Sequence, residues 1–564
     1  MPRHHRTRTI IALLALACCQ TLLAQAPVQA PVVIRVDASA SQGRWKPIWT
    51  YFGYDEPNYT YAPNGRKLIG ELSALSPTPV WIRTHHLLCT GDGTPALKWG
   101  STNAYTEDAS GNPVYDWTIV DRIFDTYEQA KSKPFVEIGF MPEALSSHPE
   151  PYTRHWPTPD DGIGWSYPPK DYGKWADLIS RWVQQSLDRY GQDEVESWYW
   201  EVWNEPDAIS YWRGTAEEYD QLYDYAALAV KRVLPAARVG GPASTGPGNP
   251  KAEAFLQQFL EHCDHGRNYA TGQPGVPLDF ITYHAKGAPK LIDGHVQMGL
   301  ARELQDVAAG FKIVAAFPRF RTLPIILSEA DPEGCAACSA RTYPPNAYRN
   351  GPLYASYTAA ALSSILALAD RQGMNLAGML TWAFEFEGQP YFDGFRTLST
   401  NGVDKPVLNL FRMAGLMRGD RLKVESSGAV GPDAILAAGV RSQPDVDALA
   451  SGTDHEVSVL VWNYHDDDVA GPEAPVTLAV TGLSRAPRVL VHHYRIDSRH
   501  SNAWTAWKAM GSPQNPSPEQ YARLEAAGKL ELLSSPSWVG TENGVATLKF
   551  SLPREAISLL QISW

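Results

Sequence analysis

Eight short apolar segments, separated by amphipathic stretches, run through the sequence from residue 45 to about residue 420. The segments have the length of β-strands, whereas apolar residues in the stretches between them recur at helical spacing. Strands that alternate with helices predict a parallel sheet covered by those helices. The predicted strands are Ile48–Tyr54, Val80–Thr84, Phe135–Gly139, Trp198–Trp203, Arg238–Gly241, Asp279–His284, Pro324–Glu329 and Gly378–Phe386. The clearest predicted helices are Val120–Ala130, Tyr172–Tyr190, Ala216–Val233 and Ala252–His262.

Eight βα units in one run predict an α/β fold, a (β/α)8 TIM barrel over residues 45–420. The main alternative is a doubly wound open sheet, but no glycine-rich phosphate-binding loop follows the first predicted strand. In a barrel of this kind the functional groups lie at the carboxyl ends of the strands. Catalytic side chains are therefore expected where the predicted strands end.

Residues 421–564 follow a different pattern, in which apolar and polar residues alternate between clusters of Gly, Pro and Asp. This alternation predicts an antiparallel β-sandwich. Pro31–Ala38 alternates in the same way, so we expect the segment 27–44 to add a strand to the sandwich. A helix is expected at Pro518–Ala527, where the alternation stops. The predicted sandwich strands are Glu456–Tyr464, Pro475–Val480, Arg488–Tyr494, Val545–Leu552 and Ala556–Trp564.

Residues 1–26 have the pattern of a secretory signal peptide. A basic stretch, Arg3–Arg8, precedes the apolar stretch Ile10–Ala17, and Ala24-Gln25-Ala26 matches a small-x-small cleavage site. Lipidation at Cys18 is the less favoured alternative, because such signals usually carry Leu where this chain has Ala15. No later segment has 18 uninterrupted apolar residues. We therefore expect a secreted or periplasmic protein with no membrane partner.

Charge and cysteine usage exclude further classes. The chain carries 49 Lys and Arg against 61 Asp and Glu, a net charge of −12, which argues against a nucleic-acid partner. A zinc site would need two more ligands at matching spacing beside Cys335 and Cys338, so neither a metal nor another cofactor is predicted. In an oxidising compartment Cys335 and Cys338 could close a loop disulfide, or Cys89 could pair with a distant cysteine. No oligomeric state can be inferred.

Two glutamates stand at the ends of predicted strands. Glu205 follows the fourth strand, where Pro206 ends the hydrogen-bond ladder and Asn204 lies beside it, and Glu329 ends the seventh strand. Three βα units separate them, so a barrel would place them across its mouth from each other. One such carboxyl group can protonate the leaving oxygen of a glycoside while the other attacks the anomeric carbon. The pair predicts a glycosidase.

Several motifs together resemble glycoside hydrolase family 39. The motifs are Lys133–Pro142, Glu201–Pro206 (Glu-Val-Trp-Asn-Glu-Pro), Lys405–Leu408, Tyr494–Asp497 and Ala506–Pro513. The resemblance extends over about residues 35–564. It implies a retaining exo-glycosidase that acts on oligosaccharides, a family with β-xylosidases in bacteria and α-L-iduronidases in animals.

The resemblance also implies roles for individual residues. Glu205 corresponds to the acid/base and Glu329 to the nucleophile, while Asn204 would hold the 2-hydroxyl of the sugar. Glu385 is a rival to Glu387 as hydroxyl acceptor, and Glu387 is preferred only because it lies nearer the expected strand end. The other residues implied to contact the sugar are His85, His284, Trp382 and Glu387.

Lys286 departs from the xylosidase pattern, which typically has Tyr two residues after the histidine at His284. Iduronidases have Lys at that place, and a cation there suits the carboxylate of a uronic acid. Arg396, in Phe395-Arg-Thr-Leu398, is also similar to the iduronidases, whereas Phe384-Glu-Phe-Glu387 resembles the xylosidases. We therefore expect a β-xylosidase that releases xylose from the non-reducing ends of xylo-oligosaccharides, with a uronidase as the enzyme alternative and a non-catalytic carbohydrate-binding protein as the alternative of another class.

Overall fold

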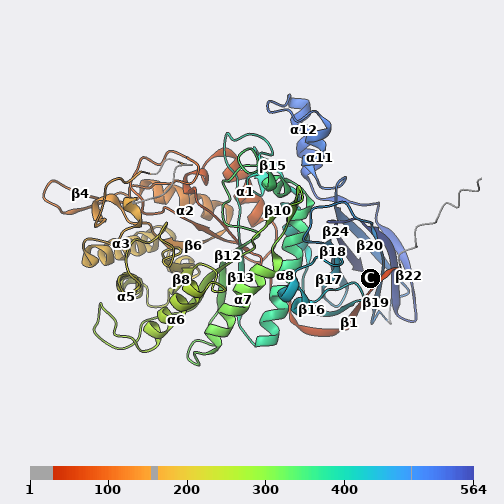
Figure 1. Ribbon diagram of the computed structural model, residues 1–564, viewed down its shortest axis with the longest axis horizontal. Coiled ribbons are helices and arrows are strands. Elements are labelled where there is room, and N and C mark those ends of the chain that lie inside the picture. Colours follow the sequence, from red (N-terminus) through yellow and green to blue (C-terminus); the bar gives the residue numbers. More distant parts are fainter. Residues whose placement is uncertain (1–29, 154–155, 157–162, 484–485) are drawn as a thin grey trace, which may run out of the picture.

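The computed structural model describes residues 30–153, 156, 163–483 and 486–564 (Figure 1). The predicted signal peptide, residues 1–26, lies outside these residues. Within them the chain forms a helix-covered barrel and, beside it, a sheet built from both ends of the described chain.

Eight parallel strands close into a barrel, which confirms the predicted fold class. Each predicted strand is present, and each is hydrogen-bonded in parallel to its two neighbours. The strands are β2 (Tyr51–Tyr54), β3 (Trp81–Thr84), β6 (Lys133–Ile138), β7 (Tyr199–Val202), β8 (Arg238–Ser244), β9 (Phe280–Lys286), β12 (Ile325–Asp331) and β13 (Leu376–Trp382).

The outer helices pack their apolar faces onto the barrel. Their starts follow local sequence signals: in α5, Thr215 accepts from the backbone N–H of Glu218, and the Glu218 side chain accepts from the N–H of Thr215. The helices are α1 (Pro63–Ser73), α2 (Thr118–Ala130), α3 (Tyr172–Tyr190), α4 (Gln192–Glu196), α5 (Ala216–Val233), α6 (Pro250–His265), α7 (Leu300–Ala315), α8 (Pro352–Gln372) and α9 (Pro406–Leu416). Short hairpins in the loops are β4 (Tyr105–Glu107) with β5 (Pro113–Tyr115), β10 (Lys290–Ile292) with β11 (His295–Gln297), and β14 (Ser399–Thr400) with β15 (Val403–Asp404).

Aromatic rings fill the barrel below the level of the predicted catalytic groups. Phe135 and Tyr199 lie side by side with ring centroids 5.2 Å apart, and the Phe280 ring packs against both. Glu137 and Glu201 are paired in register two residues further along the same strands. Because side chains two residues apart share one face of a strand, both glutamates point into the barrel directly above this aromatic layer.

The eighth strand ends at Trp382, four residues earlier than predicted. The chain turns there: Ala383 N–H donates to the carbonyl of Thr381, and the Phe384 ring stacks on Tyr54 with centroids 3.7 Å apart. Strand alternation therefore does not apply to Glu385 and Glu387, which lie in the loop.

The second unit is one hydrogen-bonded sheet rather than two separate antiparallel sheets. Its strands follow the order β21-β20-β22-β23-β19-β1-β16-β17-β18-β24, and β20 also pairs with β24, so the sheet closes on itself. All pairings are antiparallel except that of β1 with β19. The strands are β1 (Val32–Arg44), β16 (Asp420–Ser426), β17 (Asp445–Gly452), β18 (Glu456–Tyr464), β19 (Ala474–Thr481), β20 (Arg488–Ile496), β21 (Glu531–Leu532), β22 (Ser537–Glu542), β23 (Val545–Leu552) and β24 (Ile557–Ser563).

Helix α8 joins the barrel to the sheet. It contacts β17 and β18 on one side and α7 and α9 on the other. By length and composition alone it could cross a membrane, but 83% of its most apolar window is buried inside the protein. It is the central helix of the interface. Three helices belong to the sheet unit, α10 (Pro432–Ala438), α11 (Ala503–Ala509) and α12 (Pro518–Gly528), and the last two project beside β15 (Figure 1).

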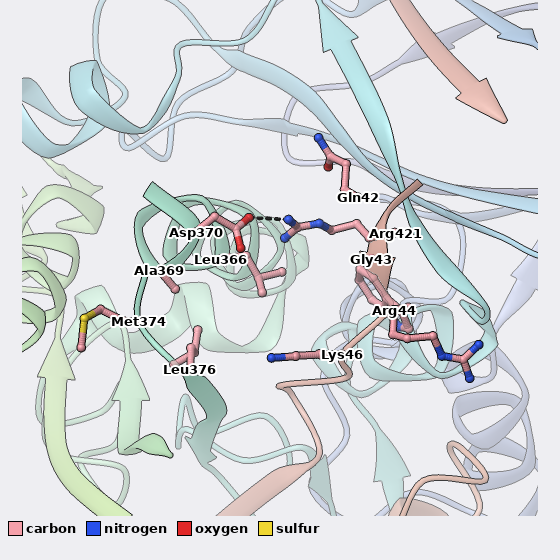
Figure 2. Close-up of a pocket in the computed structure, with 11 residues that line it drawn as sticks. Gln42, Gly43, Arg44, Lys46, Leu366, Ala369, Asp370, Met374, Leu376 and Arg421 are labelled. Carbon is pink, nitrogen blue, oxygen red and sulfur yellow. Dashed lines mark hydrogen bonds and ion pairs between the residues drawn. The ribbon is translucent and has the colours of Figure 1, made fainter. Parts of the chain in front are cut away.

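A cavity of about 200 Å³ lies where the barrel meets the sheet (Figure 2). Arg421 of β16 and Asp370 of α8 form an ion pair across it, and Lys46 and Leu376 line its wall. Lys46 precedes β2 and Leu376 begins β13, so the cavity lies at the amino ends of the strands. It is on the opposite side of the barrel from Glu205 and Glu329.

Candidate active site

A tight turn after β7 presents Glu205. The backbone has positive φ angles at Trp203 (72°) and Glu205 (44°), a conformation that non-glycine residues rarely adopt. The turn is held from both neighbouring strands, because Trp203 N–H donates to the carbonyl of Ile138 and Glu205 N–H to that of Ala243. Its fixed geometry aims the Glu205 carboxyl group into the mouth of the barrel.

Glu329 extends from β12 between two cations. Its Oε2 lies 2.9 Å from Nζ of Lys286, and its Oε1 lies 3.2 Å from Nη1 of Arg83. Burial alone would raise the pKa of this carboxyl group, but the charges of Lys286, His284 and Arg83 outweigh burial and hold the pKa well below its usual range. Glu329 is therefore an anion at neutral pH.

His284, at the end of β9, lies between the two glutamates. Its Nδ1 is 2.8 Å from Oε1 of Glu205, and its Nε2 is 3.9 Å from Oε1 of Glu329. One carboxyl oxygen of each glutamate and one ring nitrogen of His284 all lie within 4.8 Å of one another. These three residues could hold a cation, but the Lys286 ammonium already neutralises Glu329 at this point, so we assign no metal to the cluster.

Arg83 connects the acidic groups beneath the mouth. Its side chain is fully buried, and its Nη2 donates to Oδ1 of Asn204 at 2.9 Å. The same guanidinium pairs with Glu137 at 3.1 Å and Glu201 at 2.5 Å as well as with Glu329. Nδ2 of Asn204 has no hydrogen-bond partner among the described residues. Arg83 thus fixes the amide so that its N–H group stays free for a ligand.

His85 stands beside the nucleophile candidate and is buried. Its Nδ1 is hydrogen-bonded to Oε2 of Glu137, and its Nε2 lies 3.6 Å from Oε1 of Glu329. Burial and then the charge of Arg83 lower the pKa of this imidazole well below its ordinary value. The ring is therefore neutral near pH 7.

Trp382 closes the side of the site formed by β13. Its ring packs on His85 with centroids 4.3 Å apart, and the Arg83 guanidinium lies 5.1 Å from its centre. A Cβ atom at Gly53 would come within 2.4 Å of the ring, so glycine is needed on β2. The backbone N–H of Trp382 donates to Asp331, and Oδ2 of Asp331 also accepts from Lys286 at 2.8 Å. Asp331 thus couples the orientation of Trp382 to that of Lys286.

The two loop glutamates are engaged elsewhere. Both oxygens of Glu387 accept from Asn64 at the start of α1, at 2.6 and 2.9 Å. Glu385 is fully buried, accepts from Ser399 and from the backbone N–H of Asn401, and has its pKa raised by burial to about 7. Neither has an ion pair or hydrogen bond with Glu205 or Glu329 in the part of the chain that is described. A role for Glu387 in sugar binding stays a prediction.

Arg396 lies behind the site rather than in it. Its side chain is fully buried, and its guanidinium donates to the carbonyls of Trp382 and Glu333 and to that of Gly334. Its Nη2 is 3.6 Å from Oδ2 of Asp331. With its nitrogens turned toward these oxygens, Arg396 has no surface to offer a sugar. It supports Asp331 and the loop after β12, which is not the direct role in sugar binding that was expected.

That loop carries a disulfide between Cys335 and Cys338, the first of the two pairings that the sequence left open. Cys89 and Cys263 are free and buried. The buried guanidinium of Arg349 donates to the carbonyls of both bonded cysteines, at 2.8 and 3.0 Å. The loop is therefore fixed around a buried cation next to β12.

Sequence reasoning missed the buried charges that support these groups. Arg83, Glu137 and Glu201 each stand inside an otherwise apolar strand segment, as in Phe135-Val-Glu-Ile138. A charged residue rarely occupies such a place unless it is paired. A charged residue inside an apolar strand is therefore a signal that the sequence does offer. Asp55, which approaches Nε2 of His85 at 3.4 Å, follows β2 and has no such signal in the sequence.

The arrangement brings an anionic carboxylate and a second, partly exposed carboxyl group together at the mouth of the barrel, with unpaired nitrogens beside them. Side-chain exposure is 8% for Glu329 and 19% for Glu205. Nε2 of His284 and Nδ2 of Asn204 have no hydrogen-bond partner among the described residues. A buried carboxylate, a second carboxyl group close to it and free hydrogen-bond donors are the groups needed to bind a sugar and cleave its glycosidic bond.

Comparison with known proteins agrees with this chemistry. The family model "Glycosyl hydrolases family 39" matches residues 33–539. A β-xylosidase of Geobacillus stearothermophilus is 28% identical over 471 residues, covering 81% of this chain and 82% of its own. The α-L-iduronidase of Homo sapiens is 26% identical over 560 residues, covering 91% and 76%. A monomeric β-xylosidase from Caulobacter crescentus CB15 has the same fold, with TM-score 0.72 and 22% identity over 94% of this chain and 99% of its own. The chain is a glycoside hydrolase and belongs to glycosyl hydrolase family 39.

Proposed function

We propose that the protein is a retaining exo-β-xylosidase that releases xylose from the non-reducing ends of xylo-oligosaccharides. One observation carries the mechanism: carboxyl oxygens of Glu205 and Glu329 lie within 4.8 Å of each other. Retaining glycosidases hold their two carboxyl groups about 5–5.5 Å apart, whereas inverting enzymes leave about 6.5–9.5 Å for a water molecule. The short separation favours direct attack by one carboxylate.

In the first step Glu329 is the nucleophile. A carboxylate oxygen of Glu329 forms a bond to the anomeric carbon while the bond from that carbon to the leaving oxygen breaks. Glu205 gives its proton to the leaving oxygen, and the products are a glycosyl-enzyme ester and the shortened oligosaccharide. Lys286 and Arg83 keep Glu329 ionised for this attack.

In the second step the deprotonated Glu205 takes a proton from water, and the water oxygen attacks the anomeric carbon. The ester bond to Glu329 breaks, and the sugar leaves with its original anomeric configuration. Nδ2 of Asn204 is placed to donate to the 2-hydroxyl, a contact that strengthens in the oxocarbenium-like transition state. His284 lies between both carboxyl groups, 2.8 Å from Glu205 and 3.9 Å from Glu329.

The charge balance around Lys286 favours a neutral sugar. Its ammonium is 2.9 Å from Glu329 and 2.8 Å from Asp331, so two carboxylates already surround it. A uronate would compete with the nucleophile for this cation. The β-xylosidase of Geobacillus stearothermophilus is also similar over most of both chains.

The second candidate is a uronidase, because a cation at the position of Lys286 suits the carboxylate of a uronic acid even though two protein carboxylates already surround it. The Lys286 side chain is 17% exposed, and relatives of this chain include α-L-iduronidases. A non-catalytic binding protein would be expected to lack one of the two carboxyl groups, and both are present.

We also propose that the protein is exported, since residues 1–26 carry the pattern of a signal peptide. Sequencing the amino terminus of protein recovered outside the cytoplasm tests this. An intact Met1 on that protein would contradict the proposal.

The test of function uses nitrophenyl β-xyloside and a methylumbelliferyl iduronide with the same enzyme preparation. We expect the larger kcat/KM for the xyloside, and proton NMR should show β-xylose as the first product. A larger kcat/KM for the iduronide would overturn the xylosidase proposal, and α-xylose as the first product would overturn the retaining mechanism.

A further inference from the structure

We propose that Glu137 is a positioning residue that carries a proton on Oε2 and donates it to Nδ1 of His85, so that His85 presents an N–H at Nε2 toward Glu329. This inference rests on Glu329 being the nucleophile of the proposed function. It assigns a protonation state to a carboxyl group that the two-step mechanism does not use.

The first observation is what surrounds the two edges of the His85 ring. Nδ1 is hydrogen-bonded to Oε2 of Glu137, and Nε2 faces Oδ1 of Asp55 at 3.4 Å and Oε1 of Glu329 at 3.6 Å. A bare nitrogen at Nε2 would point its lone pair at two carboxylate oxygens. The hydrogen of a neutral imidazole therefore belongs on Nε2.

The second observation is that the ring cannot easily hold a second proton. It is 1% exposed and lies beside the Arg83 guanidinium, and these two causes lower its pKa well below the ordinary value. With one hydrogen on the ring and that hydrogen on Nε2, Nδ1 is an acceptor. The hydrogen in its bond to Glu137 must then come from the carboxyl group.

The third observation is the charge around Glu137 itself. This side chain is fully buried, and its Oε1 has no hydrogen-bond partner in the described part of the chain. Burial is the largest cause that raises its pKa; Arg83 from β3 opposes it, and the carboxyl groups of Glu201, Glu329 and Asp55 add to it. Three acidic neighbours and one shared cation favour the neutral acid.

The geometry at Oε2 suits a hydroxyl oxygen. Oε2 lies 3.1 Å from Nη2 of Arg83 and is also the atom bonded to His85. A protonated carboxyl oxygen can accept from the guanidinium and donate to the ring at the same time. An amide cannot do both at one atom, because its nitrogen only donates and its oxygen only accepts.

The consequence for Glu329 is an N–H that faces its Oε1, whereas Lys286 contacts its Oε2. The neutral pair of Glu137 and His85 adds no net charge next to the nucleophile, whereas an ionised Glu137 would add a negative one. The proton on Glu137 thus orients a hydrogen-bond donor toward the reacting carboxylate without weakening its anionic state.

Nitrogen-15 NMR of imidazole-labelled wild-type protein between pH 5 and pH 8 tests the inference. The His85 signals are identified by their loss in His85→Asn. We expect one protonated and one bare ring nitrogen, with Nε2 protonated, throughout this range. An imidazolium with two protonated nitrogens, or a hydrogen on Nδ1, would overturn the proposal.

The variant Glu137→Gln gives an independent test. Arg83 requires an acceptor at the position of Oε2, so the amide oxygen occupies it and the hydrogen of His85 moves to Nδ1. We expect the NMR signals to report that change, with kcat lowered by about 10–100-fold and KM changed less. An unchanged Nε2–H form in this variant would show that Glu137 does not set the tautomer.

Glu194→Gln is the control, because Glu194 pairs with Lys133 at the start of β6, the strand that carries Glu137, but touches neither Arg83 nor His85. Its His85 signals should match those of the wild type. The NMR readout needs no substrate, so failure of the xyloside assay would overturn the proposed function without deciding the protonation of Glu137. A hydrogen on Nδ1 of His85 in an active xylosidase would overturn this inference and leave the proposed function standing.

Discussion

The interior of the barrel and the interior of the closed sheet are both shielded from water, but they are filled differently. The sheet encloses aliphatic side chains such as Ile34, Val459 and Leu478, each at 0% exposure. Near its carboxyl ends the barrel encloses Arg83, Glu137 and Glu201, also at 0%. Burying charge costs free energy even when the charges are paired, whereas burying aliphatic groups stabilises a fold directly.

The contrast separates stability from function within one chain. A buried ion-pair network is weak support for stability, and hydrophobic residues of similar volume often replace one without loss. The charged layer in the barrel therefore exists for the site above it, and the aliphatic sheet, together with α8, holds the structure that carries the site. The two interiors should respond in opposite ways to substitution.

The largest expected effect separates activity from stability at Glu329. Glu329→Gln keeps the size of the side chain but removes the nucleophile, so kcat for xylosides should fall at least about 10⁴-fold, or about 5.5 kcal/mol. Thermal unfolding should shift far less. Glu425→Gln, in an exposed pair with Lys423 on β16, serves as the control and should leave kcat unchanged. Near-normal turnover by the Glu329 variant would remove its assignment as nucleophile.

The opposite behaviour is expected for Leu478 in the sheet. Its side chain lies in β19 between Ile34 of β1 and Leu548 of β23, so Leu478→Ala leaves a cavity. The free energy of unfolding should fall by about 2–5 kcal/mol, measured by urea denaturation, while kcat at low temperature stays at the wild-type value. A large loss of kcat in a folded Leu478 variant would mean that the sheet contributes more than support.

Lys286→Met sharpens the contrast inside the site itself. The change leaves Asp331 and Glu329 without their shared ammonium and should alter xyloside kcat/KM by about 1–3 kcal/mol. Because Lys286 lowers the pKa of Glu329, its loss raises that pKa, and the acid limb of the activity profile should move to higher pH. Lys290→Met, on the exposed neighbouring strand β10, is the control. An unmoved acid limb in the Lys286 variant would contradict the electrostatic role.

The smallest effect concerns Glu303 of α7, which is buried beside this network. Burial raises its pKa to about 8, and Tyr357 donates to its Oε2. Because the pKa of Glu303 is higher in the folded than in the unfolded protein, where it is about 4.3, the protonated group favours folding at low pH. This stabilisation is lost as the pH rises through 8. The free energy of unfolding should fall by about 1 kcal/mol between pH 7 and pH 8 in the wild type and less in Glu303→Gln. Equal slopes in the two proteins would contradict a raised pKa.

Much of the barrel could be predicted because its pattern repeats. Each strand is a short apolar segment between helical stretches, and the carboxyl ends of parallel strands meet at one face, so Glu205 and Glu329 could be placed together without a structure. His85 and His284 were predicted from the family resemblance, and the structure brings His284 near both glutamates and His85 near Glu329.

Residues in loops and in shared networks could not be placed in this way. Glu387 was preferred over Glu385 because it lies nearer an expected strand end, but β13 ends before both residues, and Arg396 turns inward to loop carbonyls. Arg83 and Glu137 act through contacts between strands that are distant in sequence. The spacing of apolar residues along one strand does not predict such contacts. The closure of the sheet through β20 and β24 likewise depends on register between strands, and alternation alone does not specify it.

The position of β1 has a consequence for how the chain is made. β1 lies between β16 and β19, and Val32 pairs with Val476, so β1, which is synthesised before the barrel, can join its sheet only after the whole barrel has been added. Until then the apolar residues of β1, among them Ile34 and Val36, cannot pack in the interior of the sheet. Contacts this distant in sequence form slowly and leave strand edges open in the meantime. Until β16 and β19 are made, the unpaired edges of β1 are open to pairing with other chains.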